Sequence, residues 1–469
     1  MPFLHFGLEP YSGHILYGIM IIVFIMSIFW RPIAGLMLMI VMIPIHTVRM
    51  RMIALPLGSY FFDILLLGVF IGLIVRGQFR LPKGILGKVL IGYMVFTYLS
   101  LLQGAFTLHA PLPIEFHDPR FSYWHGIMLL PLLFYAAYGC VQNRIHILLI
   151  LACMSIGILG VTKSFRKNAV EGRDFSSFSY SIRAGGSAAM GYVGINGLAA
   201  MQAQWGVFFG VLLLAERKKL RKAIYLVLAG ACGFCVLYAL SRGAYSSVLA
   251  AWVYLGTYRK KFLLLIPLVL FAITWEGIVP GAVRDRVLNT VEENGELEGS
   301  AAKRLDLWNY TMEMVKNSNP LIGDGFYTFS YFRAGEELKD THNLYLKILV
   351  ETGVIGVLLF LSVWFLMYRQ ASRVYKLAKD PWIKAIGLGF CASMVCIVVG
   401  NFFGDRWFYM QMTGYTFVMM GVINRLYAVT MAGETTFDEP IANWQPVYPV
   451  APRSRVAPVG AAVRGGFPA

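Results

Sequence analysis

The chain alternates long apolar runs with short polar connections along most of its length. A helix needs about 17 to 25 mostly apolar residues to cross a hydrocarbon core about 30 Å thick. Runs that reach or approach this length lie near residues 14–30, 33–46, 57–75, 86–106, 124–140, 145–162, 198–215, 223–240, 243–257, 262–278, 343–368, 382–404 and 407–428. The pattern predicts an all-α fold, a polytopic transmembrane helical bundle of about 12–13 spans.

Two longer polar segments divide these runs into groups. We expect N-terminal transmembrane helices over residues 1–162, a loop over 163–197, central transmembrane helices over 198–278, a large helical loop over 279–342 and C-terminal transmembrane helices over 343–432. Residues 433–469 are rich in Pro, Ala, Val and Gly without periodicity, which is typical of a disordered tail.

Composition supports the same class, because 58% of the 469 residues are hydrophobic and only 14% are charged. A soluble domain of this length needs far more polar surface. Basic loops remain on the cytoplasmic side of a membrane, and the strongly basic connections are 76–83, 216–222, 258–261 and 369–384. We therefore expect the loops 163–197 and 279–342 on the external side and the tail in the cytoplasm. Thirteen spans would place the N-terminus outside, and twelve would place it inside.

The six cysteines all lie within or at the end of apolar runs, so we expect no disulfide framework. Cys232 and Cys235 have the spacing of a metal or redox pair, but no second Cys or His pair completes four ligands. We expect them to pack in the bundle, with no metal and no cofactor. Cytoplasmic loops account for most of the net charge of +16, and we expect no nucleic-acid partner.

The expected external side carries cations that the cytoplasmic loops do not explain. They include Arg166 and Arg183 in the first loop, Arg304 in the second and Arg406 in GDRW near the end of the chain. Guanidinium groups bind phosphate oxygens in a bidentate fork, so these residues favour an anionic ligand with phosphate. The alternative is that they pair with acids of the same loops.

Arg242 differs from these loop cations, because LSRGAY (240–245) places it between two apolar runs at the external membrane boundary. A charge at that depth is usually paired or functional. Gly243 beside it would allow close backbone approach. A lipid phosphate or pyrophosphate lies at the same level of a membrane.

Five short motifs occur in order over residues 190–405. They are GYVGINGLAA (191–200), LSRGAY, SAAKRLDLW (300–308), NPLIGDGF (319–326) and THNLYLKILVETGVIG (341–356). Together they resemble the Asn-containing start of a span, the Ser-Arg-Gly element, the Arg-x-x-x-Trp stretch, the Gly-x-Gly turn and the His-containing motif of the O-antigen ligase and O-antigen polymerase superfamily. The N-terminal half of the chain is similar to that superfamily only in hydropathy.

The resemblance implies a metal-independent glycosyltransferase of the bacterial inner membrane, with its active site facing the periplasm. The donor would be a glycan on undecaprenyl pyrophosphate. An O-antigen ligase, which we favour, would transfer this glycan to lipid A core, whereas a polymerase would use a second lipid-linked unit as acceptor. A transporter of lipid-linked glycan is a rival of another class, although transporters more often contain internal repeats.

For such a transfer we expect His342 to be the base for the attacking hydroxyl, because an imidazole titrates near neutral pH. A loop histidine held by a local hydrogen bond is the alternative. The candidates for binding the pyrophosphate are Arg242, Arg304, Arg183, Arg166 and Arg406.

The helix that follows His342 carries two charges, Lys347 and Glu351. They are spaced i, i+4, so they share a helix face, and we predict that they form a structural ion pair. Glu351 lies nine residues after His342, half a turn off and about 13 Å along the axis. We therefore do not expect Glu351 to be the direct partner of the histidine.

Overall fold

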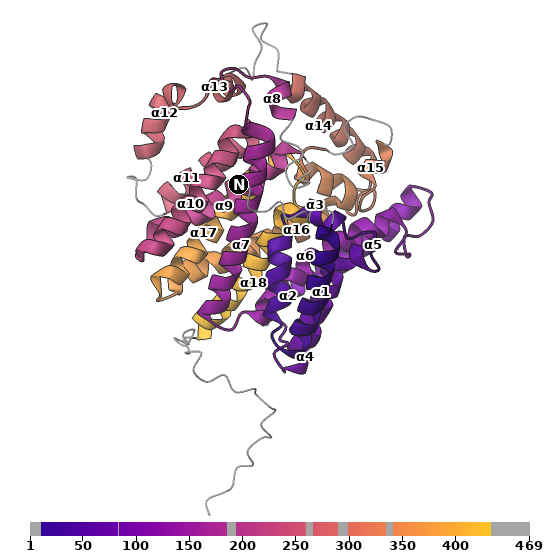
Figure 1. The fold of residues 1–469 in the computed structure, drawn as a ribbon. Helices are drawn as coiled ribbons and strands as arrows, with labels where there is room; N and C mark the ends of the chain where they lie inside the picture. Colours follow the sequence, from indigo (N-terminus) through magenta and orange to yellow (C-terminus); the bar gives the residue numbers. More distant parts are fainter. Residues whose placement is uncertain are drawn as a thin grey trace, which may run out of the picture.

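The computed structural model describes residues 11–82, 84–184, 194–258, 266–288, 299–333 and 341–432, and every regular element within these ranges is a helix (Figure 1). The predicted all-α class is confirmed. The elements are α1 (Ser12–Phe29), α2 (Ile33–Met42), α3 (His46–Met50), η2 (Gly58–Tyr60), α4 (Phe61–Val75), α5 (Ile85–Thr107), α6 (Pro119–Cys140), α7 (Arg144–Phe165), η3 (Arg166–Val170), α8 (Tyr180–Ala184), α9 (Ile195–Ala215), α10 (Lys219–Tyr238), α11 (Arg242–Tyr258), α12 (Ile266–Ile278), α13 (Gly281–Leu288), α14 (Gly299–Asn317), α15 (Phe329–Phe332), α16 (Leu344–Leu377), α17 (Pro381–Gly400), η6 (Asn401–Phe403) and α18 (Met410–Ala432). The expected tail over 433–469 lies outside the described residues.

All thirteen predicted apolar runs overlap helices. Within the described ranges, eight helical segments are long and apolar enough to cross a membrane: Ser12–Phe29, Gly58–Val75, Ile85–Thr107, Arg144–Val170, Ile195–Ala215, Lys219–Tyr238, Leu344–Leu377 and Pro381–Phe403. The other five runs form α2, α6, α11, α12 and α18, which are shorter or carry more polar residues. The chain is therefore a multi-pass membrane protein.

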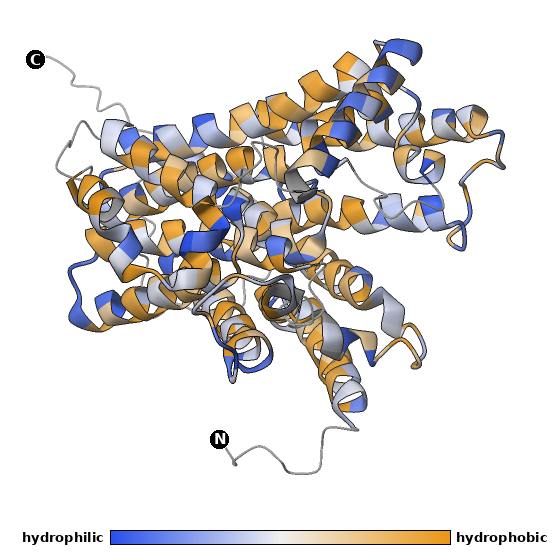
Figure 2. Cartoon of the chain, turned by 90° about the horizontal axis from the view of Figure 1, so that it is seen from above, coloured by the Kyte–Doolittle hydropathy of each residue, from blue (hydrophilic) through white to orange (hydrophobic). Residues whose placement is uncertain are grey.

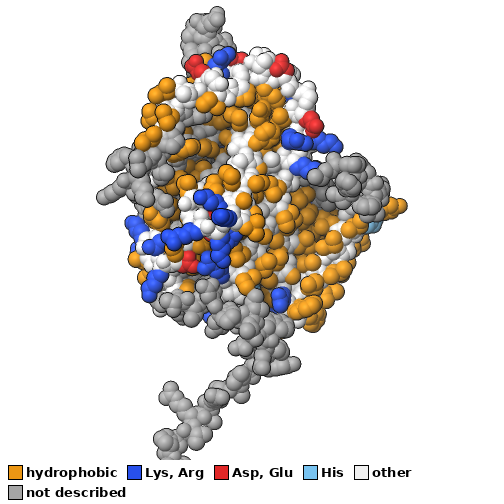
Figure 3. All heavy atoms as spheres, turned by 60° about the vertical axis from the view of Figure 1, so that its left-hand side comes forward, with side chains coloured by type: hydrophobic (Ala, Val, Ile, Leu, Met, Phe, Trp, Pro, Cys, Tyr) orange, Lys and Arg blue, Asp and Glu red, His pale blue; other side chains and the backbone are white. Residues whose placement is uncertain are grey.

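Large apolar side chains cover much of the outside of the bundle. Phe106, Val75 and Ile273 are 72%, 69% and 74% exposed, and Figure 3 shows hydrophobic atoms spread over the middle of one face. Seen from above, the helices are mostly apolar, with hydrophilic residues concentrated toward helix ends and connections (Figure 2). A surface of this kind suits lipid rather than water.

The core of the bundle forms around α9, which packs against α10, α11 and α17, while α16 packs against α5, α17 and α18. Trp205 and Phe208 of α9 are fully buried. Gly389 of α17 permits the close approach, because a Cβ there would lie 3.0 Å from the Phe208 ring. Small residues at helix contacts are the usual means of tight packing in membranes.

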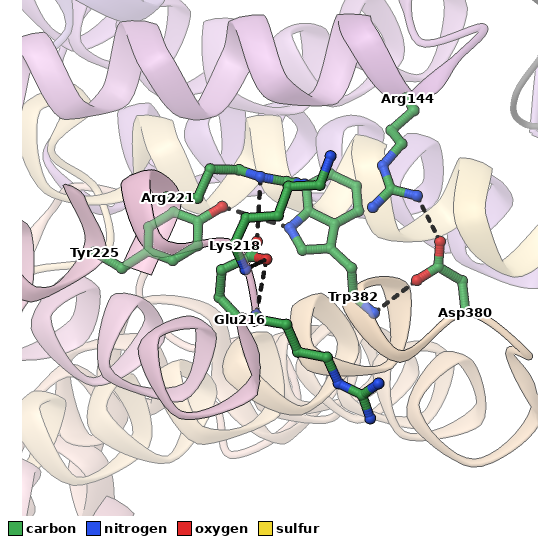
Figure 4. Close-up of polar contacts among 8 residues, drawn as sticks. Arg144, Glu216, Lys218, Arg221, Tyr225, Asp380 and Trp382 are labelled. Atoms are coloured by element: carbon green, nitrogen blue, oxygen red, sulfur yellow. Dashed lines mark hydrogen bonds and ion pairs between the residues drawn. The ribbon is translucent and has the colours of Figure 1, made fainter. Parts of the chain in front are cut away.

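Two of the basic connections meet at one end of the bundle (Figure 4). Arg144, at the start of α7, forms an ion pair with Asp380 at 2.7 Å, and its guanidinium lies 4.6 Å from the centre of the Trp382 ring. Trp382 Nε1 donates to Tyr225 Oη at 3.4 Å. These contacts join α7, α10 and the α16–α17 connection at what we call the basic end. Figure 1 shows α8, α13 and α14 at the opposite end, which we call the loop end.

Candidate functional site

The triplet Thr341–His342–Asn343 forms a turn at the loop end, immediately before α16. Asn343 caps this helix, because its Oδ1 accepts the backbone N–H groups of Tyr345 and Leu346 at 3.0 and 3.2 Å. Thr341 Oγ1 donates to the Asn343 carbonyl at 2.6 Å and accepts its N–H at 3.2 Å. His342 lies between them with φ of 48°, a left-handed conformation that is uncommon for residues other than glycine. The neighbouring polar residues therefore hold His342 in a constrained position.

The same turn is tied to the loop helix α14. Trp308 Nε1 donates to the Thr341 carbonyl at 3.1 Å. Arg304 lies four residues before Trp308, on the same face of α14. Its positive charge lowers the pKa of His342. The structure thus brings together the motif of α14 and the His-containing motif, as the sequence predicts for residues of one site.

The electrostatic surroundings favour a neutral imidazole. Burial, the largest effect, lowers the pKa of His342 from its usual value of 6.5. The positive charges of Arg304 and Arg406 lower this pKa further, and the carboxylate of Asp405 opposes them. A neutral imidazole can accept a proton, so His342 is available as a base at neutral pH.

Lys347 forms its ion pair with a residue that the sequence did not suggest. Its Nζ lies 2.7 Å from Asp405 Oδ2, and the two side chains are only 3% and 4% exposed. The pairing of Lys347 with Glu351 stays a prediction, because the ion pair that the structure describes is the one with Asp405. Helix periodicity brings Glu351 near Lys347, and the two charges do act on each other, but tertiary packing places Asp405 at the ammonium group.

Glu351 is 2% exposed and remains close to this pair. The backbone N–H groups of Tyr327 and Phe329 donate to its carboxylate, and its Oε1 has no hydrogen-bond partner among the described residues. The charge of Asp405 also acts on Glu351. The ammonium group of Lys347 and the carboxyl groups of Asp405 and Glu351 are thus buried together near the start of α16, which follows His342.

Arg406 follows Asp405 in the connection between η6 and α18. Its N–H donates to Asn401 Oδ1 at 2.9 Å and its Nη2 to the Phe403 carbonyl at 3.4 Å. The side chain is largely buried, and it wraps over the 3-10 turn η6. This connection therefore supplies two charged groups that act on His342.

Arg242 begins α11, beside a contact between two of the motifs. Ser241 Oγ donates to Asn196 Oδ1 at 2.9 Å, which joins the start of α9 to the start of α11. Gly243 lies against η6, where an added Cβ would be 3.2 Å from Phe403 Cβ. The group packed against Gly243 is thus the Phe403 side chain of the η6 turn, which lies beside Arg406.

Arg286 is a member of the site that the sequence did not single out. It is buried on α13, and its guanidinium lies 4.7 Å from the centre of the Phe178 ring and 5.7 Å from that of Tyr180. The positive charges of Arg286 and Arg304 both repel the guanidinium group of Arg242. Three arginines from α11, α13 and α14 thus converge at the loop end, and like charges held together favour an anionic ligand.

Two predicted arginines are not placed in this cluster. Arg166 is exposed in the π-helical turn η3, and none of the described contacts joins it to the cluster. Arg183 lies in the short helix α8, and its side chain is outside the described part of the structure. Their roles remain predictions from the sequence.

An apolar groove of about 890 Å³ opens beside Arg242. Residues of α9, α10, α11, α12 and α13 line it, most of them aliphatic or aromatic, with Trp252 and Trp275 among them. Arg242 is its only arginine or lysine among the described lining residues. The groove therefore combines a long apolar wall with a cation, as a ligand with an anionic head and an apolar tail requires.

The segment NPLIGDGF (319–326) docks into a break in α16. Gly353 interrupts the helix with φ of 60° and ψ of −168°. Two N–H groups of the segment donate to the carbonyls of Val350 and Glu351 at 2.9 and 2.8 Å, and two of its carbonyls accept the N–H groups just after the break at 3.0 and 3.1 Å. The buried backbone groups of the break are thus satisfied. A Cβ at Gly353 would overlap the carbonyl carbon of Leu321, so the segment packs directly against the glycine backbone.

The arrangement supplies the groups that a transfer from a pyrophosphate needs. Guanidinium groups can stabilise charge on a leaving phosphate, and a neutral imidazole can remove a proton from an attacking hydroxyl. Among the described residues, no group of three or more His, Cys, Asp and Glu side chains is placed to hold a metal ion. Sequence reasoning missed Asp405 and Arg286; the position of Asp405 directly before Arg406 was the only local signal for it.

A sequence comparison with curated proteins finds no match. Residues 224–361 match the family described as O-antigen ligase. This range contains Arg242, Arg304 and His342, and it excludes Arg183 and Arg406. The match bears out the resemblance to the O-antigen ligase superfamily over residues 224–361, which contain four of the five motifs; GYVGINGLAA (191–200) lies outside the matched range.

Proposed function

We propose that the protein transfers a glycan from undecaprenyl pyrophosphate to a hydroxyl of lipid A core, at the periplasmic face of the bacterial inner membrane. The observation that carries this proposal is the placement of Arg242 at an apolar groove of about 890 Å³, with Arg286 and Arg304 acting on it. A water-soluble sugar phosphate would not need the groove. A lipid-linked pyrophosphate would use both parts, the arginines for its head and the groove for its prenyl chain.

The reaction begins at His342. Its neutral imidazole accepts the proton of the acceptor hydroxyl while the hydroxyl oxygen forms a bond to the anomeric carbon of the glycan. The bond between that carbon and the phosphate oxygen breaks, and its electron pair leaves with the pyrophosphate. Arg242, Arg304 and Arg406 stabilise the negative charge that develops on the leaving group, without a metal ion.

A reconstituted assay tests the proposal. Purified protein in proteoliposomes, supplied with lipid-linked glycan and lipid A core, should form a new covalent glycoconjugate. His342→Ala should abolish its formation without lowering the amount of folded protein. Arg242→Lys should restore only part of the activity lost in Arg242→Ala, because an ammonium group cannot form the bidentate fork.

Three other outcomes would contradict the proposal in different ways. Transfer that persists in His342→Ala would refute the role of the histidine. Movement of the lipid-linked glycan across the bilayer without a covalent product would indicate a transporter. In a deletion strain, single repeat units attached to core would indicate a polymerase, whereas core without any polymer, together with accumulated carrier-linked polymer, is the result expected for a ligase.

A further inference from the structure

The apolar groove contains a buried amide that the protein leaves unsatisfied. Gln202 of α9 is 0% exposed and lines the groove. Neither its Oε1 nor its Nε2 has a hydrogen-bond partner among the described residues. A buried donor or acceptor without a partner is destabilising, so an amide in this position lowers the stability of the protein unless a ligand satisfies it.

Gln204, two residues further along α9, provides a direct contrast. It is 3% exposed, and its Nε2 donates to Thr416 Oγ1 of α18 at 2.8 Å. It does not line the groove. The same helix therefore satisfies one buried amide within the protein and presents the other to the groove.

The position of Gln202 along the groove follows from the helix contacts. The hydrogen bond between Ser241 and Asn196 sets the level of Arg242 at the start of α9. Gln202 lies six residues after Asn196, about 9 Å further along the helix axis. Along the groove, Arg242 therefore comes first from the loop end and Gln202 lies deeper.

We propose that Gln202 Nε2 donates a hydrogen bond to an oxygen of the phosphate that is attached to the prenyl chain. This inference rests on the proposed function. A prenyl chain offers no hydrogen-bond acceptor, and the glycan lies on the far side of the pyrophosphate, toward the loop end. The chain-linked phosphate is the polar group that enters the groove after Arg242 has bound the head, so Gln202 recognises a lipid phosphate rather than any apolar tail.

Leucine variants of the two glutamines test this role, with undecaprenyl pyrophosphate that carries no glycan as the probe and undecaprenol as its phosphate-free control. Gln202→Leu should unfold at the same or a higher temperature than the wild type, because it removes the unsatisfied amide. Its affinity for undecaprenyl pyrophosphate should fall about tenfold or more, as expected for a lost hydrogen bond to a charged group. Binding of undecaprenol should not change.

The matched variant Gln204→Leu should show the opposite pattern, with a lower unfolding temperature and unchanged affinity for the pyrophosphate lipid. In the transfer assay, Gln202→Leu should raise the KM for the donor with little change in kcat, which a general structural defect would not do. Gln202→Asn, which keeps the amide on a shorter side chain, should recover part of the affinity.

The inference would be overturned if Gln202→Leu bound undecaprenyl pyrophosphate as the wild type does, or if it lost stability as Gln204→Leu does, as expected for an amide satisfied by internal water. Arg242→Ala separates this failure from that of the proposed function. Weak binding in Arg242→Ala together with normal binding in Gln202→Leu would leave the proposed function in place, whereas absence of binding to the wild type would overturn both.

Discussion

The ion pair between Lys347 and Asp405 allows a quantitative prediction, because both side chains are almost fully buried and their charged atoms are 2.7 Å apart. At an effective dielectric constant of 20, the attraction between two unit charges at this distance is about 6 kcal/mol. Desolvation of the two ions offsets much of this attraction. Removal of one partner, however, leaves the other charge buried alone and should cost about 3–5 kcal/mol.

Glu351 makes the two single variants unequal. In Lys347→Met, the carboxyl groups of Asp405 and Glu351 remain together without their cation, so we expect the full cost. In Asp405→Asn, the carboxylate of Glu351 still attracts Lys347. The loss of folding free energy should therefore be smaller. The double variant Lys347→Met/Asp405→Asn removes both charges of the pair and should lie within about 2 kcal/mol of the wild type.

Equilibrium unfolding in mixed detergent micelles would measure these free energies for the four proteins. The expected order of stability places the double variant near the wild type, then Asp405→Asn, then Lys347→Met. A double variant as unstable as the sum of its single variants would refute the reasoning, because the two residues would then act independently. A cost below about 1 kcal/mol for Lys347→Met would show that the pair is solvated.

Three further predictions concern the turn and the helix break. The rate of glycan transfer should fall on acidification with a pKa below 6.5, because the lowered pKa of His342 keeps its imidazole neutral down to that range; a limb at or above 6.5 in a pH–rate profile would contradict this. Asn343→Ala should lower the free energy of unfolding by about 1 kcal/mol, as the loss of an N-cap does, while Asn343→Asp, which can still cap α16, should lose less. Gly353→Ala should destabilise the protein by at least about 3 kcal/mol, since the φ of Gly353 is 60° and a Cβ would overlap the Leu321 backbone. The control Gly230→Ala, in an open part of α10, should be neutral or stabilising. Equal effects of the two changes on thermal unfolding would show that the break is not required.

Much of the site could be expected from short sequence patterns. His342, Arg304 and Arg242 lie in motifs whose order along the chain is recognisable, and the structure brings these three residues to one end of the bundle. The partner of Lys347 could not be found in this way, because Asp405 is 58 residues away and no periodicity relates the two positions. The role of Arg286 was hidden for a similar reason, since one arginine in a long polar loop resembles its neighbours until packing buries it.

The all-α class and the thirteen apolar helical runs could be predicted from the sequence, because the length and apolar character of a run are local properties that decide whether a helix can cross a membrane. The sequence also predicted that the basic connections lie on one side, and the structure brings two of them, 216–222 and 369–384, to one end of the bundle. Which charges meet, where α16 breaks and which amide faces the groove follow from the packing of the helices. These features depend on contacts between segments far apart in the chain, and the cost of burying a charge or an amide is set by the neighbours that packing supplies.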